Sequence, residues 1–492
     1  MLHVREDAMN GSHQVSRRAL LRGIGAGAAG ALAYAALSAC GGSEGGGSAP
    51  AAGGDPWKRF QGTTINFISE NTAPSAAIAA NTKPFEDLTG IKINIQQMEL
   101  TKLVENVSLD FSSGTAGYHV IYADPYQVLA PFSEGLVDLN EFVGNSDFPQ
   151  PEKGLEDFIP SQLQAAGRFL DSDKLYALPY DTPTMIWQYR ADLFEKYHDK
   201  MADDLGFDPT PSINLTWDQY FQIAEWFNKN AKDDVAYGTG HQAKQHDSLQ
   251  CDFSNLLWAY GGDYFEGGQE LGTLGTKSPG KSTLTSDAAV AAAEFYNKLL
   301  GIAHPGSRTW DWDGVANAFQ AGQIAMCPNW HEFAAGNEKA LPGKVGYAPL
   351  PKGPARSANI WGGTGIGINA NCSEAERGAA WLFLNWATSP ETQFMTLASE
   401  VGGGTPTRTS VYQRPEVEEA KKRPSKLPNI LTADAVNEAW KPENIGLRPK
   451  VATWNQLNTA LFTELSRMIT GAVKPDAAMR TVAQKFDEIN KV

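Results

Sequence analysis

Tryptophans placed next to acidic residues are the side chains of this sequence that most clearly indicate a chemistry. Trp330 is followed two positions later by Glu332, and Trp258 precedes a glycine pair and Asp263. An indole ring offers a flat apolar platform, and carboxylates accept strong charge-assisted hydrogen bonds. Sugars present an apolar C–H face and a rim of hydroxyl groups. Loops that combine these residue types therefore predict a carbohydrate-binding site.

Most tryptophans in proteins pack in or against the interior, so the 13 tryptophans of this chain cannot all be binding residues. Trp217, Trp226, Trp381 and Trp386 lie in stretches of helical pattern with apolar neighbours. We predict that these four belong to the core, and we keep the expectation of ligand contact for tryptophans at loop positions.

Motifs for dinucleotide, metal or hydrolytic chemistry are incomplete or missing after residue 57. The glycine-rich stretch 363–367 does not match G-x-G-x-x-G. Residues 311–314 hold two of the spaced carboxylates of a calcium loop but lack the others. His241 and His246 are not part of an H-E-x-x-H motif, and no G-x-S-x-G elbow follows residue 57. We expect no cofactor, no metal site and no catalytic residue.

The first residues of the chain have the pattern of an export signal. Residues 16–22 read Ser-Arg-Arg-Ala-Leu-Leu-Arg, an Ala- and Gly-rich apolar run follows, and Leu-Ser-Ala-Cys closes it at Cys40. The apolar run is shorter than the roughly 20 residues of a spanning helix. We predict a twin-arginine lipoprotein signal peptide over 1–39. Cys40 is then the lipidated residue, with a Gly- and Ser-rich linker over 40–56 and an extracytoplasmic, membrane-anchored location.

Charge and cysteine content narrow the possible partners. The chain has a net charge of −15, and an acidic body repels nucleic acid and anionic lipid surfaces. We therefore expect no nucleic-acid partner, and a membrane association through the lipid alone. Three cysteines remain after Cys40, and they are widely spaced without a C-x-x-C pair, so both free thiols and one disulfide stay open.

Strand and helix patterns alternate in the first part of the chain after residue 57. Residues 63–68, 91–95 and 118–122 read as strands, with helical stretches between them. This rhythm predicts an α/β fold with a mostly parallel sheet. Ligands of such sheets lie beyond the carboxyl ends of the strands, which points to Glu70 and Asp124.

The later part of the chain repeats strand and helix patterns without a solenoid repeat. Residues 175–180, 184–189 and 323–327 are typical of strands, and Ser286 is a candidate cap for a helix over 287–300. Further helices are expected over 315–321, 374–388, 454–469 and 477–489.

Several stretches, taken in order, resemble the extracellular solute-binding proteins of ABC sugar importers, the family that includes the maltose-binding protein. Residues 175–180 and 189–194 resemble its first crossing between lobes. Residues 319–326, Phe-Gln-Ala-Gly-Gln-Ile-Ala-Met, and the following Trp330 resemble its F-x-x-G-x-x-A-M segment. The glycine-rich stretches 361–368 and 402–408 resemble its second and third crossings.

The resemblance implies a two-lobed periplasmic-binding-protein-like α/β fold with three inter-lobe crossings. Carried over to this chain, the N-terminal lobe comprises residues 57–179 plus 362–401. The C-terminal lobe comprises residues 180–361 plus 402–492. The glycine clusters at the second and third crossings suit hinge segments that change backbone angles when the lobes close.

The expected function is capture of a mono- to oligosaccharide between the lobes and its delivery to ABC permease subunits, by a monomer that makes and breaks no bond. The candidate ligand-binding residues combine strand ends, loop aromatics and positions that match the family's motifs. They are Glu70, Asp124, Tyr180, Asp181, Trp258, Asp263, Trp330, Glu332, Trp361, Arg408 and Trp454.

Two alternatives stay open at the level of the sequence. The same fold could bind another solute, such as a polyamine or a peptide, and an acidic protein would tolerate a cation. An extracellular glycoside hydrolase would need a pair of carboxylates across a cleft, for example Asp263 and Glu332. Release of reducing ends from a polysaccharide would identify the hydrolase.

Overall fold

The computed structural model describes residues 54–399, 403–423 and 425–492. The predicted signal peptide, Cys40 and most of the predicted linker lie outside these residues. Residues 52–492 form one compact unit. Among the described residues, no helix combines the length and apolar character that crossing a membrane requires.

The first sheet has five strands in the order β2-β1-β3-β10-β4. They are β1 (Thr64–Glu70), β2 (Lys92–Met98), β3 (Val120–Ala123), β4 (Ala177–Asp181) and β10 (Thr364–Ile368). β1 pairs in parallel with β2 and β3, whereas β10 runs antiparallel to β3 and β4. The predicted strands near residues 64, 92 and 120 are thus confirmed. Their parallel arrangement brings the carboxyl ends of β1 and β3 to one edge of the sheet.

The second sheet has four strands in the order β6-β7-β5-β8. They are β5 (Met185–Arg190), β6 (Tyr237–Thr239), β7 (Ile324–Trp330) and β8 (Val345–Ala348). β5 is antiparallel to β7 and β8, and β6 is parallel to β7. A short parallel pair adds β9 (Asn359–Ile360) and β11 (Ile445–Gly446).

Helices surround both sheets, and many begin at a side-chain cap. Thr216 and Gln219 form a capping box at α7, Ser373 and Glu376 form one at α12, and the predicted cap Ser286 accepts a hydrogen bond from the backbone of α9. The α-helices are α1 (Ala73–Ala80), α2 (Lys83–Thr89), α3 (Leu100–Ser113), α4 (Ala130–Phe132), α5 (Pro160–Gly167), α6 (Ala191–Leu205), α7 (Trp217–Asn230), α8 (Asp247–Ala259), α9 (Asp287–Leu300), α10 (Trp312–Gln320), α11 (Ala334–Ala340), α12 (Glu374–Ala387), α13 (Pro390–Leu397), α14 (Thr409–Tyr412), α15 (Pro415–Ala420), α16 (Ala433–Ala439), α17 (Trp454–Ile469) and α18 (Pro475–Asn490).

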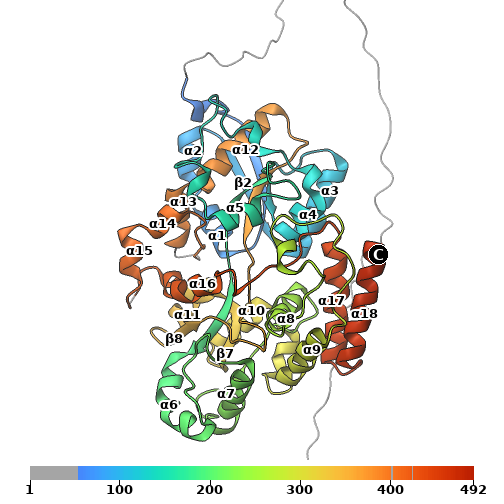
Figure 1. The fold of residues 1–492 in the computed structure, drawn as a ribbon. Coiled ribbons are helices and arrows are strands. Elements are labelled where there is room, and N and C mark those ends of the chain that lie inside the picture. Colours follow the sequence, from blue (N-terminus) through green and yellow to red (C-terminus); the bar gives the residue numbers. More distant parts are fainter. Residues whose placement is uncertain (1–53, 400–402, 424) are drawn as a thin grey trace, which may run out of the picture. The chain divides into compact units, whose positions relative to one another are not determined.

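Short helical turns connect these elements. They are η1 (Pro56–Lys58), η2 (Pro125–Leu129), η3 (Ser133–Gly135), η4 (Leu139–Glu141), η5 (Leu155–Asp157), η6 (Gly268–Gly272), η7 (Pro305–Thr309), η8 (His331–Phe333) and η9 (Pro428–Thr432). Figure 1 shows α17 and α18 side by side, and these two helices also contact α8 and α9 respectively.

Each sheet has its own apolar core. The core of the first sheet includes Trp381 and Trp386 of α12, and the core of the second includes Trp217 and Trp226 of α7. The core role predicted for these four tryptophans is confirmed. The second core also takes in Tyr126, which directly follows the first sheet's strand β3. The apolar cores of the two sheets therefore meet near the end of β3.

The chain passes between the two sheets at segments that are hydrogen-bonded to one another. β4 belongs to the first sheet and β5 to the second, and β9 is followed by β10 of the first sheet. Between them, the Gly362 N–H donates to the carbonyl of Pro183 at 2.8 Å. Residues after α13 join this point, where the Thr405 N–H donates to Asp181 Oδ1 at 2.6 Å. Three segments far apart in sequence thus meet beside one end of β4.

The three cysteines of the described residues are free and buried: Cys251, Cys327 and Cys372. The disulfide that the spacing left open does not form among them. Burial raises the pKa of all three thiols.

Candidate functional site

A cavity of about 150 Å³ lies where the strand ends of the first sheet face segments that follow the second sheet. Glu70, at the end of β1, and Asp124, directly after β3, form one side. Trp330, at the end of β7, and the first residues of α8 and α10, Asp247 and Trp312, form another. Because two parallel strands end here, the cavity has the position at which open α/β sheets bind ligands.

The wall from the first sheet is acidic and poorly hydrated. Asp124 caps η2, because its Oδ1 accepts hydrogen bonds from the N–H groups of Tyr126 and Gln127 at 2.9 and 2.7 Å. Burial raises the pKa of Asp124. Burial, together with the charge of Asp124, raises the pKa of Glu70 from 4.5 to about 8, although the Tyr122 hydroxyl donates to this carboxylate. Both carboxyl groups of this wall therefore ionise less readily than a carboxyl group in water.

The wall from the second sheet combines an indole with a carboxyl pair. The partly exposed Trp330 ring packs against the backbone of Gly362, where an added Cβ would meet ring atom Cζ3 at 2.7 Å. Glu332 follows in η8. Burial and the neighbouring Asp181 raise the pKa of Glu332 well above its ordinary range, and its protonated carboxyl donates a hydrogen bond to Asp181. Burial raises the pKa of Asp181 as well.

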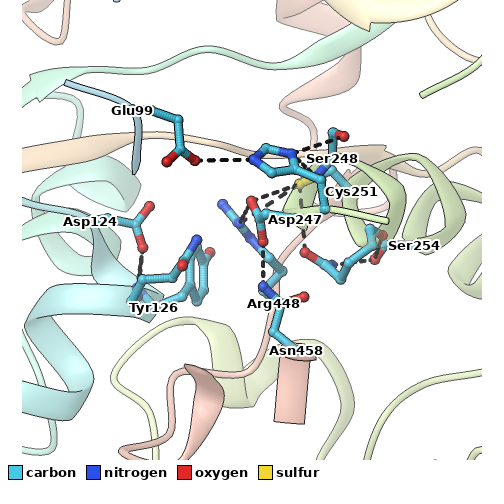
Figure 2. A network of polar contacts seen from close by, with 12 residues as sticks. Glu99, Asp124, Tyr126, Asp247, Ser248, Cys251, Ser254, Arg448 and Asn458 are labelled. Atoms are coloured by element: carbon cyan, nitrogen blue, oxygen red, sulfur yellow. Dashed lines mark hydrogen bonds and ion pairs between the residues drawn. The ribbon is translucent and has the colours of Figure 1, made fainter. Parts of the chain in front are cut away.

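Arg448 supplies the positive charge at the base of the cavity and is only 3% exposed. Its guanidinium carbon lies 4.1 Å from the centre of the Tyr126 ring, and Nη1 lies 3.9 Å from Asp247 Oδ2. Figure 2 shows the guanidinium beside Asp247 and Cys251. Burial alone would lower the pKa of Arg448, but the charges of Asp124 and Asp247 raise it above its ordinary value. Arg448 therefore stays charged and compensates these neighbouring carboxylates.

A histidine bridges the two sides near the cavity. His246 Nε2 lies 3.3 Å from Oε1 of Glu99, the residue that precedes α3. The imidazole also packs edge-on against Trp312, with ring centres 4.9 Å apart. Lys244 forms an ion pair with Asp311, which caps α10. The Asp311-Trp312-Asp313-Gly314 pattern thus serves here to begin a helix.

Comparison with known proteins identifies the family of this chain. Residues 80–425 match the model of the bacterial extracellular solute-binding protein family. The chain belongs to this family. A probable amino-acid ABC transporter periplasmic-binding protein of Sinorhizobium fredii is 22% identical, over 87% of this chain and 90% of that protein. An erythritol/L-threitol-binding protein of Mycolicibacterium smegmatis is 25% identical, over 81% of this chain and 82% of that protein.

Solved structures share the fold of this solute-binding protein. An ABC transporter solute-binding protein of Agrobacterium radiobacter in complex with ribitol has a TM-score of 0.72 at 22% identity, over 88% of this chain and 99% of that one. The maltose-bound MalE3 of T. maritima has a TM-score of 0.71 at 24% identity, over 87% and 99%. The predicted α/β, two-lobed periplasmic-binding fold is confirmed.

Four of the residues singled out in the sequence line the cavity of the solute-binding protein: Glu70, Asp124, Trp330 and Glu332. Asp181 lies directly behind them, bonded to Glu332 and to the Thr405 backbone. Tyr180 is buried in the core of the first sheet, 6.4 Å between ring centres from Tyr122.

The other predicted tryptophans are in the packed interior and do not line the cavity. Trp258 is 2% exposed and donates to Asp263, which is itself enclosed by further hydrogen bonds. Trp361 is also 2% exposed and donates to Thr182 Oγ1 at 2.7 Å. Trp454 is fully buried between Tyr126 and Tyr264. These three tryptophans are therefore not among the ligand-binding residues that we propose.

Arg408 is not among the residues that line the cavity. Its side chain is fully buried, donates to the carbonyls of Thr388, Glu152 and Gly154, and lies with Cζ 3.6 Å from the centre of the Phe158 ring. These contacts join the residues after the third crossing to a loop before α5.

Sequence reasoning missed several residues that line the cavity: Tyr122, Asp247, Trp312, Asp313 and Arg448. Tyr122 lies within a strand, and its facing direction follows from the sheet register. Asp247 and Trp312 begin helices, at positions where a cap is the ordinary explanation. Arg448 lies before α17 and belongs to no sequence motif. Only the folded structure brings it close to Asp124.

Proposed function

We propose that this protein is the extracytoplasmic binding component of an ABC importer and that its ligand is a carbohydrate. The observation that carries the proposal is the cavity in which the Trp330 and Trp312 side chains lie among carboxylates and a buried guanidinium. Indole faces suit the C–H face of a sugar, and carboxylates and guanidinium suit its hydroxyl groups. Relatives support the same ligand class: two are named as erythritol/L-threitol- and lactose-binding proteins, and solved neighbours hold ribitol, D-mannitol or maltose.

The mechanism we propose is closure around the ligand without bond making. The lobes, 57–179 plus 362–401 and 180–361 plus 402–492, rotate about the three crossings. Ligand favours the closed form because only that form places Glu70 and Trp330 around one guest. The closed protein then docks on the permease subunits. We further propose that the protein is exported through its twin-arginine signal, is anchored by lipid on Cys40, and works as a monomer.

A ligand panel tests this proposal. Neutral mono- and oligosaccharides and polyols are added to the purified protein, and intrinsic tryptophan fluorescence and the melting temperature are measured. A cognate ligand at 100 times its Kd stabilises the folded state by about 2.7 kcal/mol. Trp330→Ala should abolish the shift, whereas Glu195→Gln, on the exposed surface of α6, should keep it. If no sugar or polyol moves either signal, the carbohydrate proposal is refuted.

Two further measurements separate the remaining parts of the proposal. Incubation with the bound oligosaccharide should release no reducing ends, since release would identify a glycoside hydrolase. Cys40→Ala should move the protein from the membrane fraction to the soluble extracytoplasmic fraction. Retention of the variant in the membrane fraction would contradict the lipid anchor.

A further inference from the structure

The charges that line the cavity do not balance. Among the described residues, its lining includes one Lys or Arg, which is Arg448, and five carboxyl groups: those of Glu70, Asp124, Asp247, Asp313 and Glu332. Arg448 lies against Asp247 and acts electrostatically on Asp124. One guanidinium therefore faces two carboxylates before any ligand enters, and the other carboxyls have no cation of their own in the lining.

The neighbouring basic groups are committed elsewhere. Lys450 Nζ donates to the carbonyls of Ala165, Arg168 and Thr273, and Lys244 pairs with Asp311. His246 pairs with Glu99.

His331 directly precedes Glu332, yet it contributes no charge. Its Nδ1 accepts the hydrogen bond of the Thr184 N–H, and its Nε2 is bonded to Thr405 Oγ1. Burial lowers the pKa of His331 to about 4.

Glu70 is the carboxyl that this arrangement leaves most clearly uncompensated. The Tyr122 hydroxyl donates a hydrogen bond to it, and the charges that raise its pKa belong to Asp124, Asp247 and Glu99. By contrast, Glu332 has Asp181 as a hydrogen-bond partner. A buried polar network in a preformed cavity is stabilised when a ligand supplies the missing partner. Glu332 Oε1 and Arg448 Nε are also buried without a partner.

We infer that the ligand is a sugar or polyol that carries a protonated amine, and that Glu70 binds this ammonium group while Trp330 holds the carbohydrate skeleton. This inference rests on the proposed carbohydrate function and narrows it to amino sugars and amino polyols. An ammonium donates up to three hydrogen bonds and adds the positive charge that the lining lacks. A neutral sugar would leave the excess negative charge to be compensated by protons alone.

Matched ligand pairs test the inference with the purified full chain. Titration calorimetry compares D-glucosamine with D-glucose, 1-amino-1-deoxy-D-sorbitol with D-sorbitol, and the deacetylated chitobiose disaccharide with cellobiose. N-acetylated chitobiose is the control that keeps the skeleton and removes the charge. In the ligand pair whose skeleton fits the cavity, we expect the amine to bind at least tenfold more tightly than the neutral member. The reason is that charge-assisted hydrogen bonds are stronger than neutral ones.

Proton release provides a second readout that needs no variant. Glu70, with a pKa of about 8 in the unliganded protein, is mostly protonated at pH 7. An ammonium bound beside it favours the carboxylate, so binding should release close to one proton. Calorimetry in phosphate and in Tris measures this number. A neutral ligand that binds should release none.

Variants assign the effect to Glu70. Glu70→Gln should reduce the preference for the amine to within about threefold and should abolish proton release. Glu195→Gln, an exposed carboxylate on α6, should change neither. The inference would be overturned if the neutral ligands bound as tightly as the corresponding amines, or if an amine bound without proton release. Either result would leave the proposed function standing. Binding of amino acids or polyamines with no sugar binding at all would overturn both.

Discussion

Replacing Glu70 with glutamine should make the unliganded protein more stable at alkaline pH. Folding places this carboxyl in the cavity wall, where burial and the charge of Asp124 raise its pKa from 4.5 to about 8. Between these two pH values the folded state holds a proton that the unfolded state has lost. The free energy of unfolding therefore falls as the pH rises through this window, and the loss is complete above pH 8.

The size of the effect follows from the shift. Each pKa unit corresponds to about 1.4 kcal/mol, so the rise to about 8 corresponds to about 5 kcal/mol for a fully enclosed group. Glu70 keeps partial contact with solvent in the cavity, and this screening reduces the expected gain to about 2–3 kcal/mol. Glutamine keeps the shape and can still bond to the Tyr122 hydroxyl, so the packing should be preserved.

Urea unfolding of Glu70→Gln and the wild type at pH 5, 7 and 9 measures the difference. We expect no more than a small difference at pH 5, where Glu70 is protonated in the folded state, and the full gain at pH 9. Glu195→Gln is the control, since this carboxylate lies exposed on α6. Equal or lower stability of Glu70→Gln at pH 9 would refute the argument that Glu70 carries an uncompensated buried charge.

Three further predictions concern other parts of the structure. Gly362→Val should displace the Trp330 ring, which an added Cβ would approach to 2.7 Å, and should weaken ligand binding at least tenfold in calorimetry; unchanged affinity would contradict the placement of this ring. Trp454→Phe should cost about 1–3 kcal/mol in urea unfolding and leave the affinity within threefold, because this indole is fully buried outside the cavity; a large loss of affinity at unchanged stability would instead support direct ligand contact. The thiols of Cys251, Cys327 and Cys372 are buried and free, so iodoacetamide should label none of them before unfolding and all of them afterwards, as measured by mass spectrometry. A mass corresponding to a disulfide would contradict the structure.

Local patterns in the sequence were sufficient to predict the first sheet and one side of the cavity. The alternation of residues around 64–68 and 118–122 places apolar side chains in a core, and a parallel sheet then brings the ends of both strands to one edge. Glu70 and Asp124 follow from this reasoning alone. The F-x-x-G-x-x-A-M segment over 319–326 led to Trp330, the aromatic that follows it, and Glu332 lies two residues further on.

The roles of individual tryptophans could not be obtained in this way. Trp258, Trp361 and Trp454 were predicted to contact ligand as Trp330 was, yet their indole N–H groups or ring faces are enclosed by the protein itself. Whether an indole faces solvent or core depends on packing against residues up to hundreds of positions away. A short window of sequence does not contain that information.

The sequence by itself determined the fold class, the succession of strands and helices, and the residues at the carboxyl ends of the first strands, because each depends on hydrophobic period and chain order. Only the tertiary structure decided that Arg448 and Asp247 meet Asp124, that Trp312 enters the lining, and that Glu332 is hydrogen-bonded to Asp181. Arg448, Asp247 and Asp124 come from segments more than a hundred residues apart in sequence, as do Glu332 and Asp181. Their charges and pKa values arise from mutual distance and exclusion of water, which exist only once the chain has folded.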